Sequence, residues 1–300
     1  MQRFSTCLWF DHQAEEAARF YTAVFRNARG TSTSHYSEAG QEIHGRPPGT
    51  VVTVEFELEG QAFVALNGGP HVAFTPAISF MVNCDTAAEV DALWSRLADG
   101  GIPLMALDSY PFSDRYGWIQ DRYGVSWQLI LGQGAARQKI MPVLMFVGRK
   151  YGKAEEAIRF YTSVFPNAKA GSIFRYGPGQ TLDRPEAVAY ADFELDGRLF
   201  AVMESGYDHR FDFSEAISFI VHCRDQREVD DYWDKLAADP ADGQCGWLKD
   251  RYGVSWQIVP TVLYQLLRDA DAAQSQRVMR VLLQMRKLDI DGLQRAYDHA

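Results

Sequence analysis

Residues 117–128 read GWIQDRYGVSWQ, and residues 246–257 read GWLKDRYGVSWQ. In both copies, Asp-Arg-Tyr-Gly places Asp first and Gly fourth in a four-residue turn. This arrangement is typical of a type I turn that is followed by a left-handed glycine. The residues on either side of the turn predict two strands. We therefore expect each copy to form a β-hairpin.

Each predicted hairpin carries one amide on its last strand. Because side chains alternate between the two faces of a strand, Gln128 shares a face with Ser126, and Trp127 lies on the other. Gln257 and Ser255 share a face in the second copy. A buried amide needs a partner, which is either a ligand in a cup or a neighbouring backbone group in a packed interior. The strand pattern leaves both interpretations open.

The hairpin belongs to a longer tandem repeat. The stretch AEEAARFYTAVFRNA at residues 14–28 returns as AEEAIRFYTSVFPNA at 154–168, and ISFMVNC at 78–84 returns as ISFIVHC at 217–223. The repeating unit of about 130 residues has the length of a small domain. The remaining C-terminal residues have no counterpart and show helical spacing. We therefore predict a first domain at 1–135, a second at 136–260, and a helical tail at 261–300.

Within each unit the hydrophobic spacing predicts one pattern twice. Apolar alternation indicates strands, and apolar residues at helical spacing between residues 14 and 25 indicate a helix. A capping box at Thr86–Glu89 begins the next helix. Each unit therefore consists of two strand–helix–three-strand modules, which predicts an α+β fold. The tail is expected to be a helical cap or an arm that forms a homodimer.

The composition excludes several classes of protein. The net charge of −9 argues against a general nucleic-acid binder, which needs a basic surface. The four cysteines show neither CxxC spacing nor a disulfide framework, which indicates a reducing compartment. No signal-peptide pattern and no apolar run long enough for a membrane span is present. We expect a cytoplasmic protein with neither nucleic acid nor membrane as a partner.

The paired modules, the helix motif ending Arg-Phe-Tyr-x-x-Val-Phe and the repeated hairpin together resemble the vicinal oxygen chelate superfamily, which has the glyoxalase and bleomycin-resistance fold. More closely, the sequence resembles its PhnB-like branch, labelled 3-demethylubiquinone-9 3-methyltransferase. The resemblance covers both units and extends to residues 285–291. It implies tandem domains, each with two βαβββ modules that form a cupped sheet, plus C-terminal helices.

The resemblance also implies where a metal would bind in metal-dependent members, namely to His and Glu side chains in the cup. The Glu of the last strand falls on Gln128 and Gln257, and a neutral amide is a poor ligand for a divalent cation. The first and fifth strands offer no His. Asn67 and Glu204 lie near the fourth strand. We therefore expect no tightly bound metal and no other cofactor.

A long segment at residues 107–117 distinguishes the first unit, because the second unit lacks about ten residues here. Aromatic walls with a few polar groups are typical of small-molecule pockets, so the segment is a candidate lid or wall of the first cup. Alternatively, Phe112 packs onto its own hairpin at the surface. The candidate ligand-cup residues are Gln128, Gln257, Asn67, Tyr110, Phe112, Ser113, Ser126 and Ser255.

Three functions remain open. The first is a cytoplasmic protein that binds a small organic molecule in a cup, with its reaction unassigned. The second is a metal-dependent lyase, isomerase or dioxygenase that uses Glu204 and Gln257, and Glu204 is also the one candidate catalytic carboxylate. The third is a non-catalytic structural or interaction module. We do not expect a methyltransferase, because the sequence has no glycine-rich strand-to-helix turn for an adenosine-containing donor.

Overall fold

The computed structural model describes residues 2–132, 137–179, 182–268 and 272–299. The first two strand–helix–three-strand modules have the predicted order of elements. The first contains β1 (Phe4–Phe10), α1 (Ala14–Val24), β2 (Ala28–His35), the short α2 (Gln41–His44), β3 (Val51–Leu58) and β4 (Gln61–Asn67). The second contains β5 (Ile78–Cys84), α3 (Ala87–Leu97), β6 (Ile102–Tyr110), β7 (Ser113–Gln120) and β8 (Ser126–Leu131).

The second half of the chain repeats this order and then adds helices. The third module contains β9 (Ile140–Val147), the 3₁₀ turn η1 (Gly148–Lys150), α4 (Ala154–Val164), β10 (Lys169–Arg175), β11 (Val188–Leu195) and β12 (Arg198–Ser205). The fourth contains β13 (Ile217–Cys223), α5 (Gln226–Leu236), β14 (Gly243–Gln244), β15 (Trp247–Lys249) and β16 (Ser255–Pro260). The tail forms α6 (Val262–Arg268), α7 (Ala272–Leu282) and α8 (Ile290–Asp298).

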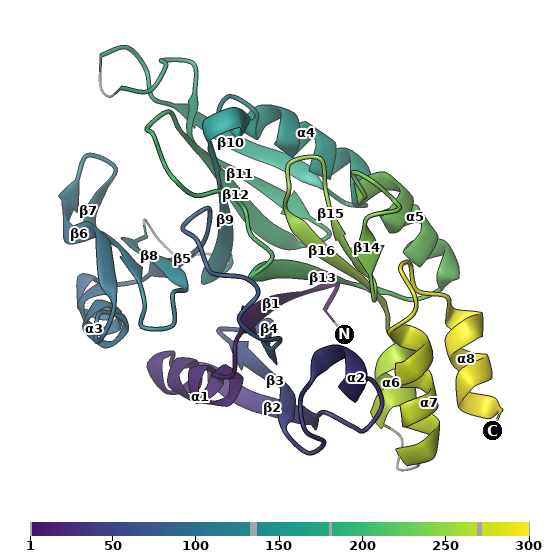
Figure 1. Ribbon diagram of the computed structural model, residues 1–300. Coiled ribbons are helices and arrows are strands. Elements are labelled where there is room, and N and C mark those ends of the chain that lie inside the picture. The colour runs from purple at the N-terminus through teal and green to yellow at the C-terminus, as the bar shows by residue number, and fades with distance from the viewer. Residues whose placement is uncertain (1, 133–136, 180–181, 269–271, 300) are drawn as a thin grey trace.

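Each of the two eight-stranded sheets combines modules from both units (Figure 1). Sheet A has the order β14-β15-β16-β13-β1-β4-β3-β2, and sheet B the order β10-β11-β12-β9-β5-β8-β7-β6. The units join where β1 pairs antiparallel with β13 and β9 with β5. Two βαβββ modules per sheet were predicted correctly, but the prediction placed the two modules of one unit in the same sheet. Sheet A instead joins the first module to the fourth, and sheet B joins the second to the third. The predicted unit boundary at 135/136 lies outside the described residues.

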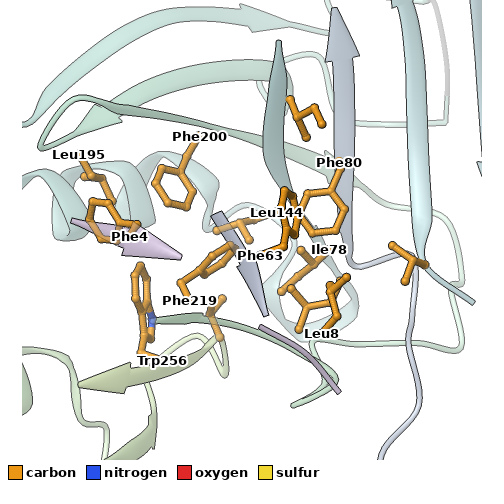
Figure 2. Close-up of a cluster of buried hydrophobic side chains, with 14 of the residues drawn as sticks. Phe4, Leu8, Phe63, Ile78, Phe80, Leu144, Leu195, Phe200, Phe219 and Trp256 are labelled. Carbon is orange, nitrogen blue, oxygen red and sulfur yellow. The ribbon is translucent and has the colours of Figure 1, made fainter. Parts of the chain in front are cut away.

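The two sheets share one hydrophobic core. We call the sheet face that contacts this core the inner face, and the opposite one the outer face. Figure 2 shows side chains from both sheets meeting there, including Phe63 near Phe80 and Phe200 near Phe219. The ring centroids of these pairs are 5.5 and 5.2 Å apart. Helices α1, α3, α4 and α5 add their apolar faces to the same core.

The repeated Asp-Arg-Tyr-Gly turn is held by a buried carboxylate. Asp121 Oδ1 accepts hydrogen bonds from the backbone N–H groups of Tyr123 and Val125, at 2.9 and 3.1 Å. Its Oδ2 accepts from Tyr21 Oη and Trp127 Nε1, both at 2.8 Å. Asp250 makes the same four types of contact in the second copy. The turn, β8 and α1 are therefore joined at one side chain.

Basic residues before β1 and β9 link modules across the units. Arg3 Nε lies 2.9 Å from Asp196 Oδ2, and Arg3 Nη1 lies 2.8 Å from Glu228 Oε2. At the corresponding place before β9, Lys139 Nζ lies 2.9 Å from Glu89 Oε2. These pairs lie where β1 meets the fourth module and β9 meets the second. They therefore support the pairing of modules from different units.

The pair of Arg3 and Glu228 predicts a dependence of stability on pH. Burial raises the pKa of Glu228, but hydrogen bonds from Arg3 and Arg224 outweigh burial and lower the pKa from 4.5 to about 2. The contribution is therefore present above pH 4.5 and is lost as the pH falls from 4.5 towards 2. We expect Arg3→Met to lower the free energy of unfolding by about 2 kcal/mol at pH 7. Urea denaturation should show a smaller difference at pH 3, and an undiminished one would contradict this assignment.

No helix within the described ranges is both long enough and apolar enough to cross a lipid bilayer.

Candidate functional site

The outer face of sheet B carries Gln128 in a hydrogen-bond network. Gln128 Oε1 accepts from Tyr116 Oη at 2.7 Å, and Gln128 Nε2 donates to Ser79 Oγ at 2.9 Å. The same nitrogen lies 3.7 Å from Met203 Sδ. Burial raises the pKa of Tyr116, so its hydroxyl stays protonated and donates to the amide. Gln128 is only 1% exposed, so the amide lies at the base of this face.

Methionine and aromatic side chains surround this network. Five of the eight methionines of the chain belong to the two hydrophobic clusters on this face, namely Met81, Met105, Met141, Met145 and Met203. The second of these clusters also contains the aromatic side chains of Tyr110, Tyr116, Trp118 and Phe211. Methionine is flexible and polarizable, so it adapts its shape to irregular partners. The face is therefore apolar and deformable around one fixed amide.

The segment predicted as a lid or wall is the tip of the β6–β7 hairpin. Tyr110 and Tyr116 contribute to the outer face of sheet B, whereas Phe112 is 56% exposed. The Phe112 ring packs on Tyr110 and Tyr116, with centroids 5.6 and 4.9 Å apart. Ser113 Oγ donates to the carbonyl oxygens of Arg115 and Leu131. The structure thus places Phe112 against its own hairpin, and Ser113 fastens the hairpin to β8.

The outer face of sheet A carries the equivalent amide in different surroundings. Gln257 Nε2 donates to Ser218 Oγ at 2.9 Å. Burial raises the pKa of the nearby Cys7 thiol to about 12, against hydrogen bonds with Gln257 and Ser218. Trp247 packs edge-on against Trp9, with centroids 5.6 Å apart. Helices α6–α8 cover this face.

The two serines beside the amides also differ. Ser126 Oγ accepts from Trp118 Nε1 at 2.6 Å on sheet B. On sheet A, Ser255 Oγ is buried and has no hydrogen-bond partner among the residues that the structure describes. Both serines lie on the same face as the neighbouring glutamine, as predicted. The two outer faces therefore carry the same pair of polar residues, but the serine has a hydrogen-bond partner only on sheet B.

Asn67 and Glu204 lie on the inner faces, so their predicted placement in a cup is corrected. Asn67 Oδ1 accepts from the backbone N–H of Ala14 at 2.8 Å, at the first residue of α1. Glu204 Oε1 accepts from the N–H of Ala154 at 2.8 Å, at the first residue of α4. Glu204 Oε2 accepts from Val188 N at 2.8 Å. Both side chains satisfy helix N-termini, which removes Glu204 as a base beside either amide.

The outer faces do not fit the divalent metal centre that the fold permits. Among the described residues, no three His, Cys, Asp or Glu side chains lie close enough together to hold an ion. Gln128 directs its amide nitrogen, which cannot bind a cation, towards Ser79 and Met203. Its oxygen already accepts from Tyr116. We therefore derive no step through a metal at this place.

Comparison with known proteins identifies the family. The family model described as 3-demethylubiquinone-9 3-methyltransferase matches residues 2–130 and 138–259. The chain belongs to this family. The predicted relation to the branch labelled 3-demethylubiquinone-9 3-methyltransferase is thereby confirmed. No curated protein matches the chain.

Solved structures similar to this family member include single-unit and double-unit proteins. The PhnB protein from Bacillus cereus, described as a 3-demethylubiquinone-9 3-methyltransferase, is 42% identical, with 44% of this chain and 100% of that chain covered and a TM-score of 0.40. A protein from Staphylococcus aureus is 32% identical, with 44% and 98% covered and a TM-score of 0.18. Glyoxalase I from Zea mays is 11% identical, with 84% and 92% covered and a TM-score of 0.51. This last likeness supports the predicted α+β glyoxalase fold.

Several residues of the site in this PhnB-like protein were not among the predicted ones. Ser79 and Ser218 could have been found, because each recurs in the repeat and lies on the strand that pairs directly with the strand of its glutamine. Met141 and Met145 alternate with core residues along β9. Nothing in the sequence indicates that Met203 contacts Gln128, because the two residues belong to different units. The sequence does not show that strands from different units pair in one sheet, and this pairing brings Met203 to Gln128.

Proposed function

We propose that this PhnB-like protein binds a small, uncharged organic molecule on the outer face of sheet B. The observation that carries the proposal is the difference between the two outer faces. Helices α6–α8 cover the face of sheet A. In the part of the chain that the structure describes, the two clusters on the face of sheet B contain only strand and loop residues. An apolar face of this kind, with a few polar groups, is typical of ligand sites.

The chemistry of the face supports an uncharged ligand with one hydrogen-bond acceptor. The groups bonded to one another at its base, Gln128, Tyr116, Ser79, Ser126 and Trp118, are all neutral. The second N–H of Gln128 Nε2 is directed at the sulfur of Met203, which is a weak acceptor. An oxygen or nitrogen of a ligand would be a stronger partner for that N–H. Movement of the methionines would make the necessary room.

The reaction stays unassigned, and neither methyl transfer nor metal chemistry is part of the proposal. The family name describes a methyltransferase, but the glycine-rich turn expected for a nucleotide-containing donor is missing from the sequence. The cytoplasmic location expected from the cysteines is likewise part of the proposal, and all four cysteines are free thiols.

One observation favours a second candidate, a non-catalytic interaction module. The polar groups at the base of sheet B already satisfy one another, so this face could bind a second copy of the chain instead of a ligand. Sedimentation velocity separates the two candidates. A monomer that binds a neutral fluorophore supports ligand binding, and a dimer that excludes the fluorophore supports the interaction module.

Shortening the β6–β7 hairpin should weaken ligand binding without unfolding the protein. The equivalent β14–β15 hairpin is naturally short in the same chain. We expect deletion of residues 108–113 to lower the affinity for the neutral fluorophore N-phenyl-1-naphthylamine about tenfold. The deletion removes Tyr110, and Tyr116 thereby loses the ring that packs against it. A fluorescence titration measures the affinity, and circular dichroism checks the fold. Unchanged affinity in a folded variant would contradict the proposed site.

A further inference from the structure

The three tail helices form a separate hydrophobic cluster with the outer face of sheet A. Figure 1 shows α6, α7 and α8 together at one side of the molecule, next to the C-terminal end of the chain. The cluster contains Leu263, Leu266, Val278, Leu282, Leu288 and Leu293 from the tail and its connections, with Cys7, Ile220 and Val259 from the sheet. It is distinct from the core that the two sheets share. The tail can therefore separate from sheet A while the shared core stays packed.

A few polar contacts fasten α6 to sheet A. Tyr264 Oη lies 3.3 Å from His222 Nδ1, and His222 Nε2 lies 2.8 Å from Ser5 Oγ. Arg268 Nη2 lies 2.8 Å from Glu55 Oε2, and this pair is largely exposed. Burial lowers the pKa of His222 to about 4, so the ring is neutral near pH 7. The contacts of α6 are thus one neutral hydrogen bond to a buried ring and one surface ion pair, each of modest strength. The connection between α7 and α8 adds the Lys287–Asp230 ion pair and hydrogen bonds of the Gln226 amide with Leu288 O and Ile290 N. The backbone N–H groups of Cys245 and Gly246 also donate to the carbonyl oxygens of Met285 and Arg286, both at 2.8 Å.

The covered face keeps polar groups that the tail does not use. Within the described parts of the chain, Ser255 Oγ is buried without a partner, although leaving a buried hydroxyl unpaired is unfavourable. Gln257 and the Cys7 thiol lie on the same face. If the three tail helices were always packed on this face, apolar side chains would be expected beneath them in place of these polar groups. These groups fit a face that is also exposed in another state.

We propose that α6–α8 are an intramolecular lid that occupies the outer face of sheet A and opens as a unit. The Tyr264–His222 contact and the Arg268–Glu55 pair hold the α6 end of the lid closed, and the contacts of residues 285–290 with the fourth module hold its other end. Opening exposes Cys7, Ser255 and Gln257 while the shared core stays folded. This inference concerns sheet A and is independent of ligand binding on sheet B. It gives the two faces of the duplicated protein different states, one open and one closed.

Labelling of Cys7 tests the lid in the full chain. Cys7 lies in the cluster beneath the tail, whereas Cys84 and Cys223 lie in the shared core and report global unfolding. We expect 5,5′-dithiobis(2-nitrobenzoate), followed by mass spectrometry of the labelled peptides, to modify Cys7 faster than the two core cysteines. The double variant Tyr264→Phe, Arg268→Gln should increase the rate at Cys7 about tenfold and leave the core rates unchanged.

A control variant away from the tail checks that a change in the labelling rate of Cys7 is specific to the lid. Tyr123→Phe removes a hydroxyl that donates to Glu16 at 2.9 Å, away from the tail, and should leave the rate at Cys7 unchanged. If Cys7 reacts only as fast as Cys84 and Cys223, in both the wild type and the double variant, the tail opens only with global unfolding. That result would overturn the lid.

Discussion

Replacement of Asp121 by alanine should lower the free energy of unfolding by about 3–5 kcal/mol, because it leaves buried donors without their acceptor. Four donors are involved, from Tyr21, Trp127 and the backbone of Tyr123 and Val125. These donors come from α1, the turn and β8, so the loss should affect several elements at once. Urea denaturation at pH 7 measures the effect.

The asparagine variant and a surface aspartate provide the comparison. Asp121→Asn keeps one oxygen but replaces the other with a donor, so we expect an intermediate loss of about 1–3 kcal/mol. Asp99→Ala removes an exposed ion pair with Arg122 and should cost less than about 1 kcal/mol. Equal effects of Asp121→Ala and Asp99→Ala would show that the buried carboxylate does not hold the hairpin.

The Gln128→Leu variant should weaken binding of N-phenyl-1-naphthylamine by about tenfold to a hundredfold. It removes the amide beneath the bound fluorophore and leaves Tyr116 Oη and Ser79 Oγ without their partner. The disturbed base of the site should therefore add to the loss of the direct contact. Fluorescence titration at constant protein concentration measures the dissociation constant.

The duplicated chain supplies the matched control for this prediction. Gln257→Leu removes the equivalent amide beneath the tail, where it donates to Ser218. With the lid closed, we expect the affinity for the fluorophore to stay within about twofold of the wild type. Equal losses in both variants would show that the two faces bind alike, and no loss in either would remove the amide from the site.

Local sequence patterns predicted the repeating part of the fold because they act over a few residues. The Asp-Arg-Tyr-Gly turn and the alternation along β8 placed Gln128 and Trp127 on opposite faces, and the structure confirms this. The helix and strand order of each module followed in the same way from hydrophobic spacing. The α+β glyoxalase fold was therefore available from the sequence.

The pairing of modules was not available, because both units present nearly the same strands. In the structure β1 pairs with β13, so the first module joins the fourth and not the second. This long-range choice decides which residues surround each amide. It brings Met203 to Gln128 and Cys7 to the neighbourhood of Gln257. It also explains why the tail, at the end of the fourth module, lies against sheet A.

Glu204 and Asn67 show how one step along a strand changes a functional interpretation. Glu204 follows Met203, so its side chain points to the opposite face of sheet B. Its carboxylate accepts from the backbone N–H of Ala154, the first residue of α4, and from that of Val188, the first residue of β11. Asn67 has the same role at α1. Proximity to the end of a strand was known from the sequence, but the face was not.

A crystal structure of the full chain with N-phenyl-1-naphthylamine bound would test the central claim most directly. We predict that electron density for the fluorophore lies over Gln128, between the β6–β7 hairpin and Met203, with α6–α8 still packed on sheet A. Density against Gln257 in place of the tail, with the outer face of sheet B unoccupied, would contradict the account.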